Sequence, residues 1–289
     1  MSVVAPERPL VADRPPMRTK QHRWTFYILP VFTIGVIVYL ASPVFLMILY
    51  SFNNIRGERQ IAKFTCCTLH WWRQYRVIPD LNEALWTSIK VAVPSSVIAS
   101  ILGSLVGLVL GRYPFRGRGL TNFVIFLAIA IPEIVLGSAL LSLFVQVNTS
   151  RPAGAAITIG YPTILLSHIA FSIPFVAIVV RARVQGLDRS LEDAAQDLFA
   201  TPMVAFFKVT LPLILPGVVA GFLLSFVLSL DDFVITNFVQ GQTNTFPTWV
   251  YGATRIGVPP QVNVWGAILF GAGVLLAGLN LVKGRRATA

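Results

Sequence analysis

The segment Leu187–Gly217, LDRSLEDAAQDLFATPMVAFFKVTLPLILPG, is a long polar-to-amphipathic stretch between hydrophobic runs, and it decides how the rest of the chain is interpreted. Its pattern predicts two short helices in series. Ser190 is expected to cap the first helix, with Asp193 three residues later closing a capping box. Thr201 is expected to cap the second, with Pro202 in its first position, where a missing N–H costs nothing.

The first of these predicted helices is amphipathic, because its apolar residues recur at helical spacing. The apolar face consists of Leu191, Ala194, Ala195 and Leu198. Pro212 and Pro216 are expected to end the segment where the next apolar run begins. An ordered helix with an apolar face, presented on a loop, offers a surface that a partner protein can bind.

The composition is that of a polytopic membrane protein, with 289 residues, 55% of them hydrophobic and 12% charged. Six apolar segments reach the length of about 20 residues that spans a bilayer. They lie near Phe26–Phe52, Trp86–Leu110, Leu120–Val147, Tyr161–Val180, Leu213–Leu230 and Val262–Val282. The sequence therefore predicts an all-α membrane protein with six transmembrane helices. Residues 1–24 are Pro-rich and basic and are expected to form a disordered cytoplasmic tail.

The distribution of basic residues predicts the orientation. If the N-terminus is inside, 15 of the 23 Lys and Arg residues fall on the cytoplasmic side, as the positive-inside rule requires. Both termini and the Leu187–Gly217 segment are then cytoplasmic. The net charge of +11 is mostly explained by this topology, and a nucleic-acid partner is not expected.

Few residues suggest catalysis or metal binding. Cys66 and Cys67 are adjacent, and neighbouring cysteines bond to each other only with strain, so we interpret them as incidental. His168 lies in a predicted span without other convergent ligands and is interpreted as a packed or pore-lining residue. The sequence contains no P-loop, nucleophile elbow or metal motif. We therefore expect no catalytic or metal-ligating residues, and no ATP hydrolysis by this chain.

The central segment also carries a family resemblance. The runs Glu192–Ala195, Val209–Pro212 and Pro216–Gly217 resemble the EAA loop of binding-protein-dependent ABC importer permeases. In that family the short helix of the loop docks into a cleft of the cytoplasmic ATP-binding subunit. The family usually has Gly, which permits a tight turn between the helices, where this chain has Phe199. The resemblance implies a coupling role for Leu191, Glu192, Asp193, Ala194, Ala195, Leu198 and Phe199.

The resemblance extends over roughly Phe26 to Lys283. Four further runs are similar to the spermidine/putrescine importer permeases, namely Tyr50–Asn53, Phe64–Thr65 with Trp71–Trp72, Arg112–Gly117 and Ser229–Phe233. It implies a type I importer fold over residues 25–284, a cytoplasmic tail at 285–289, and a place in the bacterial inner membrane among lipid. It also implies three partners: a second homologous permease, a dimer of ATP-binding subunits that hold ATP and Mg, and an extracytoplasmic solute-binding protein. No cofactor is expected on this chain itself.

Three carboxylates are candidates for the substrate path. Glu133 lies in the third predicted span at a depth of roughly 20 Å, and Asp231 and Asp232 lie at the outer end of the fifth. Such acids are costly in a membrane and suit a cationic amine. Glu133 could instead pair with Lys90. The two aspartates could instead cap a helix or be hydrated at the outer membrane interface. Adjacent helical residues point about 100° apart, so at most one aspartate would face the path.

The sequence favours the permease subunit of an ABC importer, with a polyamine as its solute. Another small solute, such as an opine, a phosphonate or ferric iron, is the alternative within the class. A stand-alone secondary transporter or channel is the alternative outside it. Such a protein needs its coupling sites within one chain, often between internal repeats, and no clear repeat is visible here.

Overall fold

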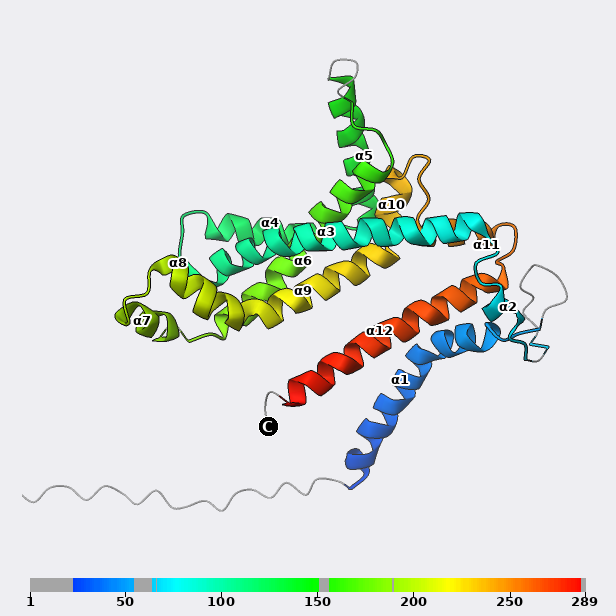
Figure 1. Ribbon diagram of the computed structural model, residues 1–289, viewed down its shortest axis with the longest axis horizontal. Coiled ribbons are helices and arrows are strands. Elements are labelled where there is room, and N and C mark those ends of the chain that lie inside the picture. Colours follow the sequence, from blue (N-terminus) through cyan, green and yellow to red (C-terminus); the bar gives the residue numbers. More distant parts are fainter. Residues whose placement is uncertain (1–22, 55–63, 66, 151–155, 189, 287–289) are drawn as a thin grey trace, which may run out of the picture. The chain divides into compact units, whose positions relative to one another are not determined.

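The computed structural model describes residues 23–54, 64–65, 67–150, 156–188 and 190–286 (Figure 1). The predicted tail at 1–24 lies outside these residues except for its last two positions, and Cys66 and the last three residues of the chain also lie outside them. Over the described ranges every regular element is a helix, and the extended backbone pairing is limited to one isolated bridge between Asn53 and Cys67. The predicted all-α class is confirmed.

The described chain divides into two compact units. The first contains α1 (Arg23–Tyr50) and α12 (Pro260–Arg286) from Gly266 onward. Within it, Met47 of α1 lies directly against Gly266, where a β-carbon would come within 2.5 Å of the methionine sulfur. Helix α1 continues through Pro30 and Pro43, so neither proline ends it.

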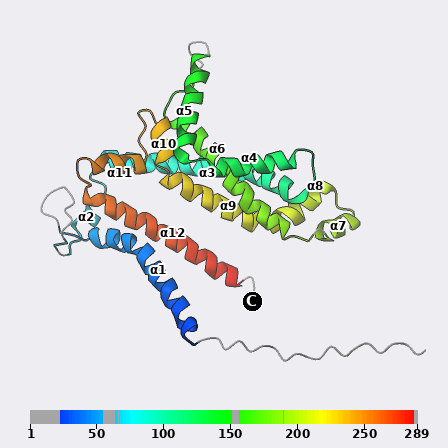
Figure 2. The same ribbon diagram turned by 180° about the vertical axis from the view of Figure 1, so that it is seen from behind.

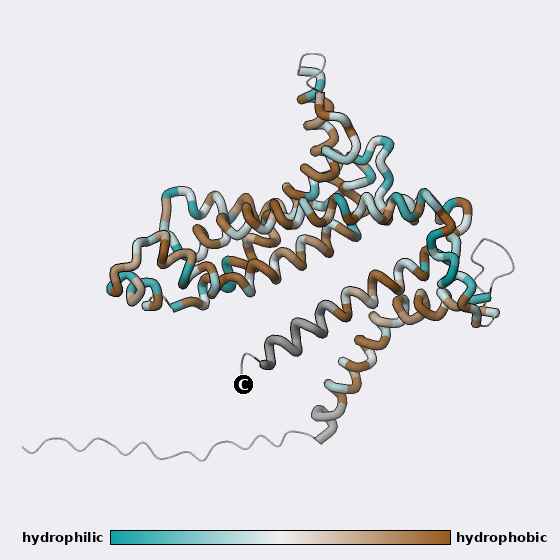
Figure 3. The backbone as a smooth tube through the Cα atoms, viewed as in Figure 1, coloured by the Kyte–Doolittle hydropathy of each residue, from teal (hydrophilic) through white to brown (hydrophobic). Residues whose placement is uncertain are grey.

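The second unit, Phe52–Trp265, contains the elements that position the candidate site. Helices α3 (Pro79–Arg112), α6 (Tyr161–Gln185) and α9 (Leu211–Asp231) pack on one another, and both views show them side by side (Figures 1 and 2). Hydrophobic residues follow the lengths of these helices, and hydrophilic residues gather in the loops (Figure 3). Shorter helices complete the unit: α2 (His70–Arg73), α10 (Val234–Val239) and α11 (Phe246–Thr254).

Close approach of α3 to α6 depends on glycines. A β-carbon at Gly107 would lie 2.6 Å from the carbonyl oxygen of Ala177, and one at Gly103 would lie 2.7 Å from Cβ of Val176. Small residues at these positions let two helix backbones pack with little between them. The glycines thus let α3 and α6 pack closely along this face.

The third predicted span is not one continuous helix. It consists of α4 (Arg118–Ala130) and α5 (Glu133–Thr149), which are bent by 106° relative to each other. Pro132 explains the break, because its ring clashes with a helical conformation at the preceding residue, and Ile131 is accordingly extended (φ −67°, ψ 128°). The bend places Glu133 in the first turn of α5.

Four helical runs of the described residues are long and apolar enough to cross a membrane: α1 from Ile28, α3, α6 and Pro202–Asp231. A fifth span results if α4 and α5 count as one. The apolar stretch found in α12 is Pro260–Leu275, which is shorter. Each predicted span thus has a helical counterpart, and the count of six and the orientation stay predictions. The fifth predicted span ends at Asp231 and does not run on past Asp232.

The Leu187–Gly217 segment forms α7 (Ser190–Asp197) and α8 (Pro202–Ala205), so the two predicted helices are confirmed. Thr201 caps the second as predicted, since its side chain accepts from the backbone N–H of Val204. The predicted cap of the first was wrong, because α7 begins at Ser190 itself. Asp188 accepts the backbone N–H of Ser190 at 2.9 Å, and this hydrogen bond lowers the pKa of the Asp188 carboxyl.

The prolines do not end the segment as predicted. Helix α8 runs through a π-helical turn, η1 (Phe206–Thr210), directly into α9, with Pro212 in the first turn of α9 and Pro216 inside it. The wider π-turn shifts the backbone hydrogen bonds by one residue just before Pro212, which has no N–H to donate. Pro202–Asp231 is consequently one helical run.

Candidate functional site

The three candidate carboxylates lie where two helices are interrupted. Glu133 follows the bend between α4 and α5, and Asp231 is the last residue of α9. Helix α10 (Val234–Val239), which follows Asp232 in the chain, packs against α5, whose first residue is Glu133. Residues about 100 positions apart in the sequence are therefore brought into one acidic cluster, which we call the carboxylate cluster.

The cluster members differ in accessibility. The side chains of Glu133 and Asp231 are exposed, whereas the side chain of Asp232 is 3% exposed. Helix α9 ends at Asp231 and Asp232 is extended, so the two aspartates differ in exposure, and that at most one faces the path stays a prediction. Only two of the three carboxylates are accessible to a solute on the described surface of this chain.

The alternative role for Glu133, an ion pair with Lys90, is wrong. Neither residue takes part in an ion pair within the described part of the chain, and both side chains are exposed. Lys90 contributes its backbone carbonyl to the structure, which accepts a hydrogen bond from the Tyr161 hydroxyl at 2.9 Å. Glu133 begins α5 after the 106° bend and so does not lie within a continuous third helix, as the pairing assumed.

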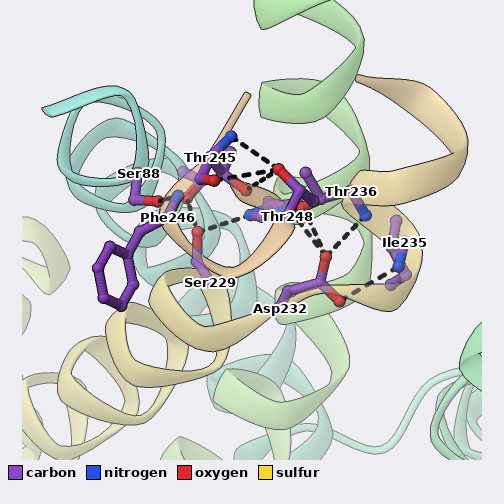
Figure 4. A network of polar contacts seen from close by, with 10 residues as sticks. Ser88, Ser229, Asp232, Ile235, Thr236, Thr245, Phe246 and Thr248 are labelled. Carbon is purple, nitrogen blue, oxygen red and sulfur yellow. Dashed lines mark hydrogen bonds and ion pairs between the residues drawn. The ribbon is translucent and has the colours of Figure 1, made fainter. Parts of the chain in front are cut away.

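Asp232 caps the start of α10. One carboxylate oxygen accepts from the backbone N–H of Ile235 at 3.3 Å, and the other accepts from both the N–H and the hydroxyl of Thr236, at 2.8 and 2.7 Å (Figure 4). His168 Nε2 lies 3.3 Å from the second oxygen. The capping alternative for Asp232 is thus confirmed, and the carboxylate also gains a histidine partner.

His168 joins three helices. Its Nε2 lies 2.8 Å from the Thr236 hydroxyl, and its Nδ1 lies 2.7 Å from the hydroxyl of Ser229, which in turn lies 3.1 Å from the hydroxyl of Ser95. Because Thr236 donates to Asp232, it accepts from His168, so Nε2 carries a proton. The interpretation of His168 as a packed residue is confirmed by its 1% exposure.

Sequence reasoning missed this network. Ser95, Ser229 and Thr236 are polar residues in apolar helices, which is a signal, but serine and threonine in membrane helices usually bond to their own backbone. The bonded positions lie 61 to 134 residues apart, so their pairing depends on how α3, α6 and α9 pack. The network holds α9 and α10 at the edge of the carboxylate cluster.

The predicted coupling residues of α7 lie on an open surface. Leu191 is 47% exposed, Leu198 82% and Phe199 97%, Asp193 and Ala194 are also exposed, and Ala195 is half-buried. No residue of α7 is buried within the described chain. The apolar face identified in the sequence is therefore available to another protein.

Glu192 differs from its neighbours because it bonds within the chain. Its Oε2 lies 2.5 Å from Nη2 of Arg112, the last residue of α3, and its Oε1 accepts a hydrogen bond from the hydroxyl of Thr210. Glu192 therefore bonds to a basic and a polar group of this chain itself. Sequence reasoning missed Arg112, which is 80 positions away.

Phe199 completes the turn that the family usually makes with glycine. Its φ is 61°, the positive value that favours glycine. The backbone N–H of Ala200 donates to the carbonyl of Ala195, and that of Phe199 to the carbonyl of Gln196, which is the hydrogen-bond pattern of a Schellman motif. The tight turn therefore forms with phenylalanine at the position.

Across the described ranges no group of three or more His, Cys, Asp or Glu side chains could hold a metal ion. The site combines an acidic cluster at two helix interruptions with an exposed apolar helix on a loop.

Comparison with known proteins points in one direction. The model of the family described as binding-protein-dependent transport system inner membrane component matches residues 103–283. The putrescine transport system permease protein PotI of Escherichia coli K12 is 35% identical over 236 residues, which cover 81% of this chain and 82% of PotI. The spermidine/putrescine permease PotC of the same organism is 35% identical over 239 residues, covering 82% and 86% of the two chains.

The fold is also found among solved structures. A bacterial ABC transporter involved in the import of the acidic polysaccharide alginate matches with a TM-score of 0.63 at 16% identity, over 94% of this chain and 99% of the other. The methionine ABC transporter MetNI in an inward-facing conformation matches with a TM-score of 0.54 at 20% identity, over 72% and 96%. At these identities the similarity concerns the fold.

Proposed function

This chain belongs to the family of binding-protein-dependent transport system inner membrane components and is a permease subunit of an ABC importer in the inner membrane. From this premise we propose that it imports a polyamine. In this proposal the chain forms half of the translocation pathway, and a second homologous permease forms the other half. An extracytoplasmic binding protein delivers the solute. A dimer of separate subunits binds ATP and Mg and hydrolyses the ATP.

The observation that carries the solute assignment is the 35% identity to the permeases PotI and PotC over more than four fifths of the chain. The chemistry of the carboxylate cluster supports it. Two exposed acids, Glu133 and Asp231, can offer negative charge to an ammonium group that has lost its water, whereas Asp232 is already bonded to Thr236 and His168. Glu133 and Asp231 are therefore our candidates for contact with the solute.

The proposed contact with the ATP-binding subunits is the apolar face of α7 together with the exposed ring of Phe199. Exposed apolar side chains of this size are costly in water unless a partner covers them. We do not assign Glu192 to the contact with the ATP-binding subunits, because its carboxylate bonds to Arg112 and Thr210. We expect docking to depend on Leu191, Ala194, Leu198 and Phe199, with Asp193 and Ala195 at the edge.

The experiment is ATP-dependent uptake by the purified complex of this chain, the second permease, the ATP-binding subunits and the binding protein in liposomes. Labelled putrescine and spermidine are compared with an opine, a phosphonate and ferric iron. We expect uptake of a polyamine. Uptake of a different solute class alone would overturn the assignment of the solute while leaving the importer class intact.

Glu133→Gln tests the contribution of the carboxylate cluster in the same assay. Loss of one negative charge from a dehydrated cation site should raise the KM for the polyamine about tenfold or more. The melting temperature should stay unchanged, because Glu133 has no ion pair to lose within the described residues. Lys90→Met serves as the matched control and should transport normally. Wild-type KM in Glu133→Gln would exclude Glu133 from the solute path.

A further inference from the structure

Three elements meet at the carboxylate of Glu192. The residue lies on α7, its Oε2 contacts Arg112 at the end of α3, and its Oε1 accepts from Thr210, the last residue of the π-helical turn η1. The Arg112 side chain is 7% exposed and that of Glu192 is 23% exposed. We call these three residues the Glu192 clamp.

The clamp adds a link to α3 to the packing of α7 on η1 and α8. The helix has no buried residue, and its large apolar side chains are exposed. Covalently α7 is joined to α6 and α8, and the ion pair adds a direct link to α3. Removing one partner of a largely buried ion pair leaves an uncompensated charge, so α7 is strongly favoured to stay with the end of α3.

Helix α3 leads from the clamp to the carboxylate cluster. Ser95 lies 17 residues before Arg112, which is about 25 Å along a helix. Its hydroxyl contacts that of Ser229 on α9, two residues before Asp231. Between these ends, the glycine contacts at Gly103 and Gly107 hold α3 tightly against α6. A packed helix of this kind moves as a rigid body rather than bending at each residue.

We propose that the Glu192 clamp transmits the movement of α7 to α3, and that Arg112 is the positioning residue that makes this transmission possible. The proposal rests on the proposed function, since it requires α7 to be moved by ATP-binding subunits. It assigns Glu192 to the connection within the permease and leaves the docking contact to its apolar neighbours. ATP hydrolysis and transport are then linked through a polar contact that can be changed without altering the docking face.

The test is the number of solute molecules imported per ATP hydrolysed by the reconstituted complex. Arg112→Met and Glu192→Gln should each lower this ratio about tenfold, while the rate of ATP hydrolysis stays within about twofold of wild type, because the docking face is unchanged. The exchanged pair, Arg112→Glu with Glu192→Arg, restores the ion pair and should recover much of the ratio. Thr210→Val, which keeps the ion pair, should lower it about threefold.

Matched controls separate the clamp from a general loss of charge. Arg118→Met removes an arginine that donates to the Leu110 carbonyl near the same end of α3, and Asp197→Asn removes an exposed acid of α7; both should keep the wild-type ratio. An unchanged ratio in Arg112→Met and Glu192→Gln would overturn the proposal. The proposal would also be overturned if uptake, ATP hydrolysis and complex assembly all fell by the same factor, because that result indicates a structural role alone.

If the proposed function itself is wrong, the experiment gives a different result. In that case the wild-type complex would not copurify with ATP-binding subunits, or would show neither polyamine uptake nor ATP hydrolysis stimulated by the loaded binding protein. If the single variants do not fold, as judged by gel filtration in detergent, Thr210→Val and the exchanged pair carry the test. A wild-type ratio in Thr210→Val together with no recovery in the exchanged pair would then reject the clamp.

Discussion

Phe199 occupies a backbone conformation that usually belongs to glycine at the end of a helix. The left-handed region brings the β-carbon close to the following carbonyl oxygen and costs roughly 1–2 kcal/mol for a residue other than glycine. The chain keeps this conformation because two Schellman hydrogen bonds close the turn. In return the ring is placed almost fully in solvent, 97% exposed, at the tip of the loop. A residue held in strain and left uncovered suggests a contact with another protein.

Replacement of Phe199 separates strain from contact. Phe199→Gly should stabilise the loop by about 1 kcal/mol relative to Phe199→Ala. Glycine has no β-carbon, so it adopts the positive φ without the steric cost that alanine has. Both variants lack the ring, so both should bind the ATP-binding subunits more weakly than wild type. Hydrogen exchange of α7 measures the first effect, and titration of the permease with ATP-binding subunits measures the second. Equal affinity of all three proteins would show that the ring makes no contact.

At the scale of helices, the carboxylate cluster is positioned by the points where helices are interrupted rather than by the continuous spans. The bend between α4 and α5 exposes Glu133 at a helix start, where the helix dipole favours a negative charge. The end of α9 exposes Asp231, and Asp232 satisfies the free N–H groups of α10. Irregular backbone at membrane depth is tolerated where it is buried in protein or lines a cavity. The carboxylate cluster lies at two such irregular points of the backbone.

The packing of α3 on α6 gives a prediction of its own. Gly107→Ala places a β-carbon 2.6 Å from the Ala177 carbonyl oxygen and 3.1 Å from the Arg181 nitrogen, and backbone atoms cannot rotate away. The two helices must separate, which should destabilise the protein by about 1–3 kcal/mol. Gly119→Ala in α4 is the matched control, since nothing lies within 4 Å of its added carbon. Thermal unfolding in detergent compares the two, and equal melting temperatures would contradict the packing argument.

At the scale of the molecule, the exposed apolar surface is the main feature. In α1 most large side chains from Ile28 to Leu49 are exposed, and α3 and α9 also carry exposed apolar residues. A soluble monomer rarely exposes contiguous apolar area of this extent. In our proposal, lipid and the second permease cover these helices in the membrane.

The orientation of the whole chain can be tested by labelling. Both termini should be cytoplasmic, because most of the basic residues then lie inside. Single cysteines replacing Ser2 or Thr288, in a background where Cys66 and Cys67 are serine, should not react with a membrane-impermeant maleimide in intact spheroplasts and should react after lysis. The native chain, with exposed Cys67 on the predicted outer loop, is the positive control. Reaction of either terminal cysteine in intact spheroplasts would contradict the predicted cytoplasmic location of that terminus.

The sequence alone determined the class, the approximate spans, the two loop helices and the position of the acidic residues. These features depend on local properties: apolar length, helical spacing, capping side chains and the fixed φ of proline. The helix cap at Thr201 follows from a hydroxyl three residues before the N–H it bonds, so the chain specifies it without tertiary contacts.

Tertiary structure alone decided which polar groups meet. Glu192 bonds to Arg112 across 80 positions, His168 contacts Ser229 and Asp232, and Glu133 forms no ion pair with Lys90 among the described residues. Local patterns could not predict these pairings, because the bonded partners lie 61 to 80 positions apart in the sequence. The packing of α3, α6 and α9, with its close glycine contacts, determines which of these polar groups come within bonding distance.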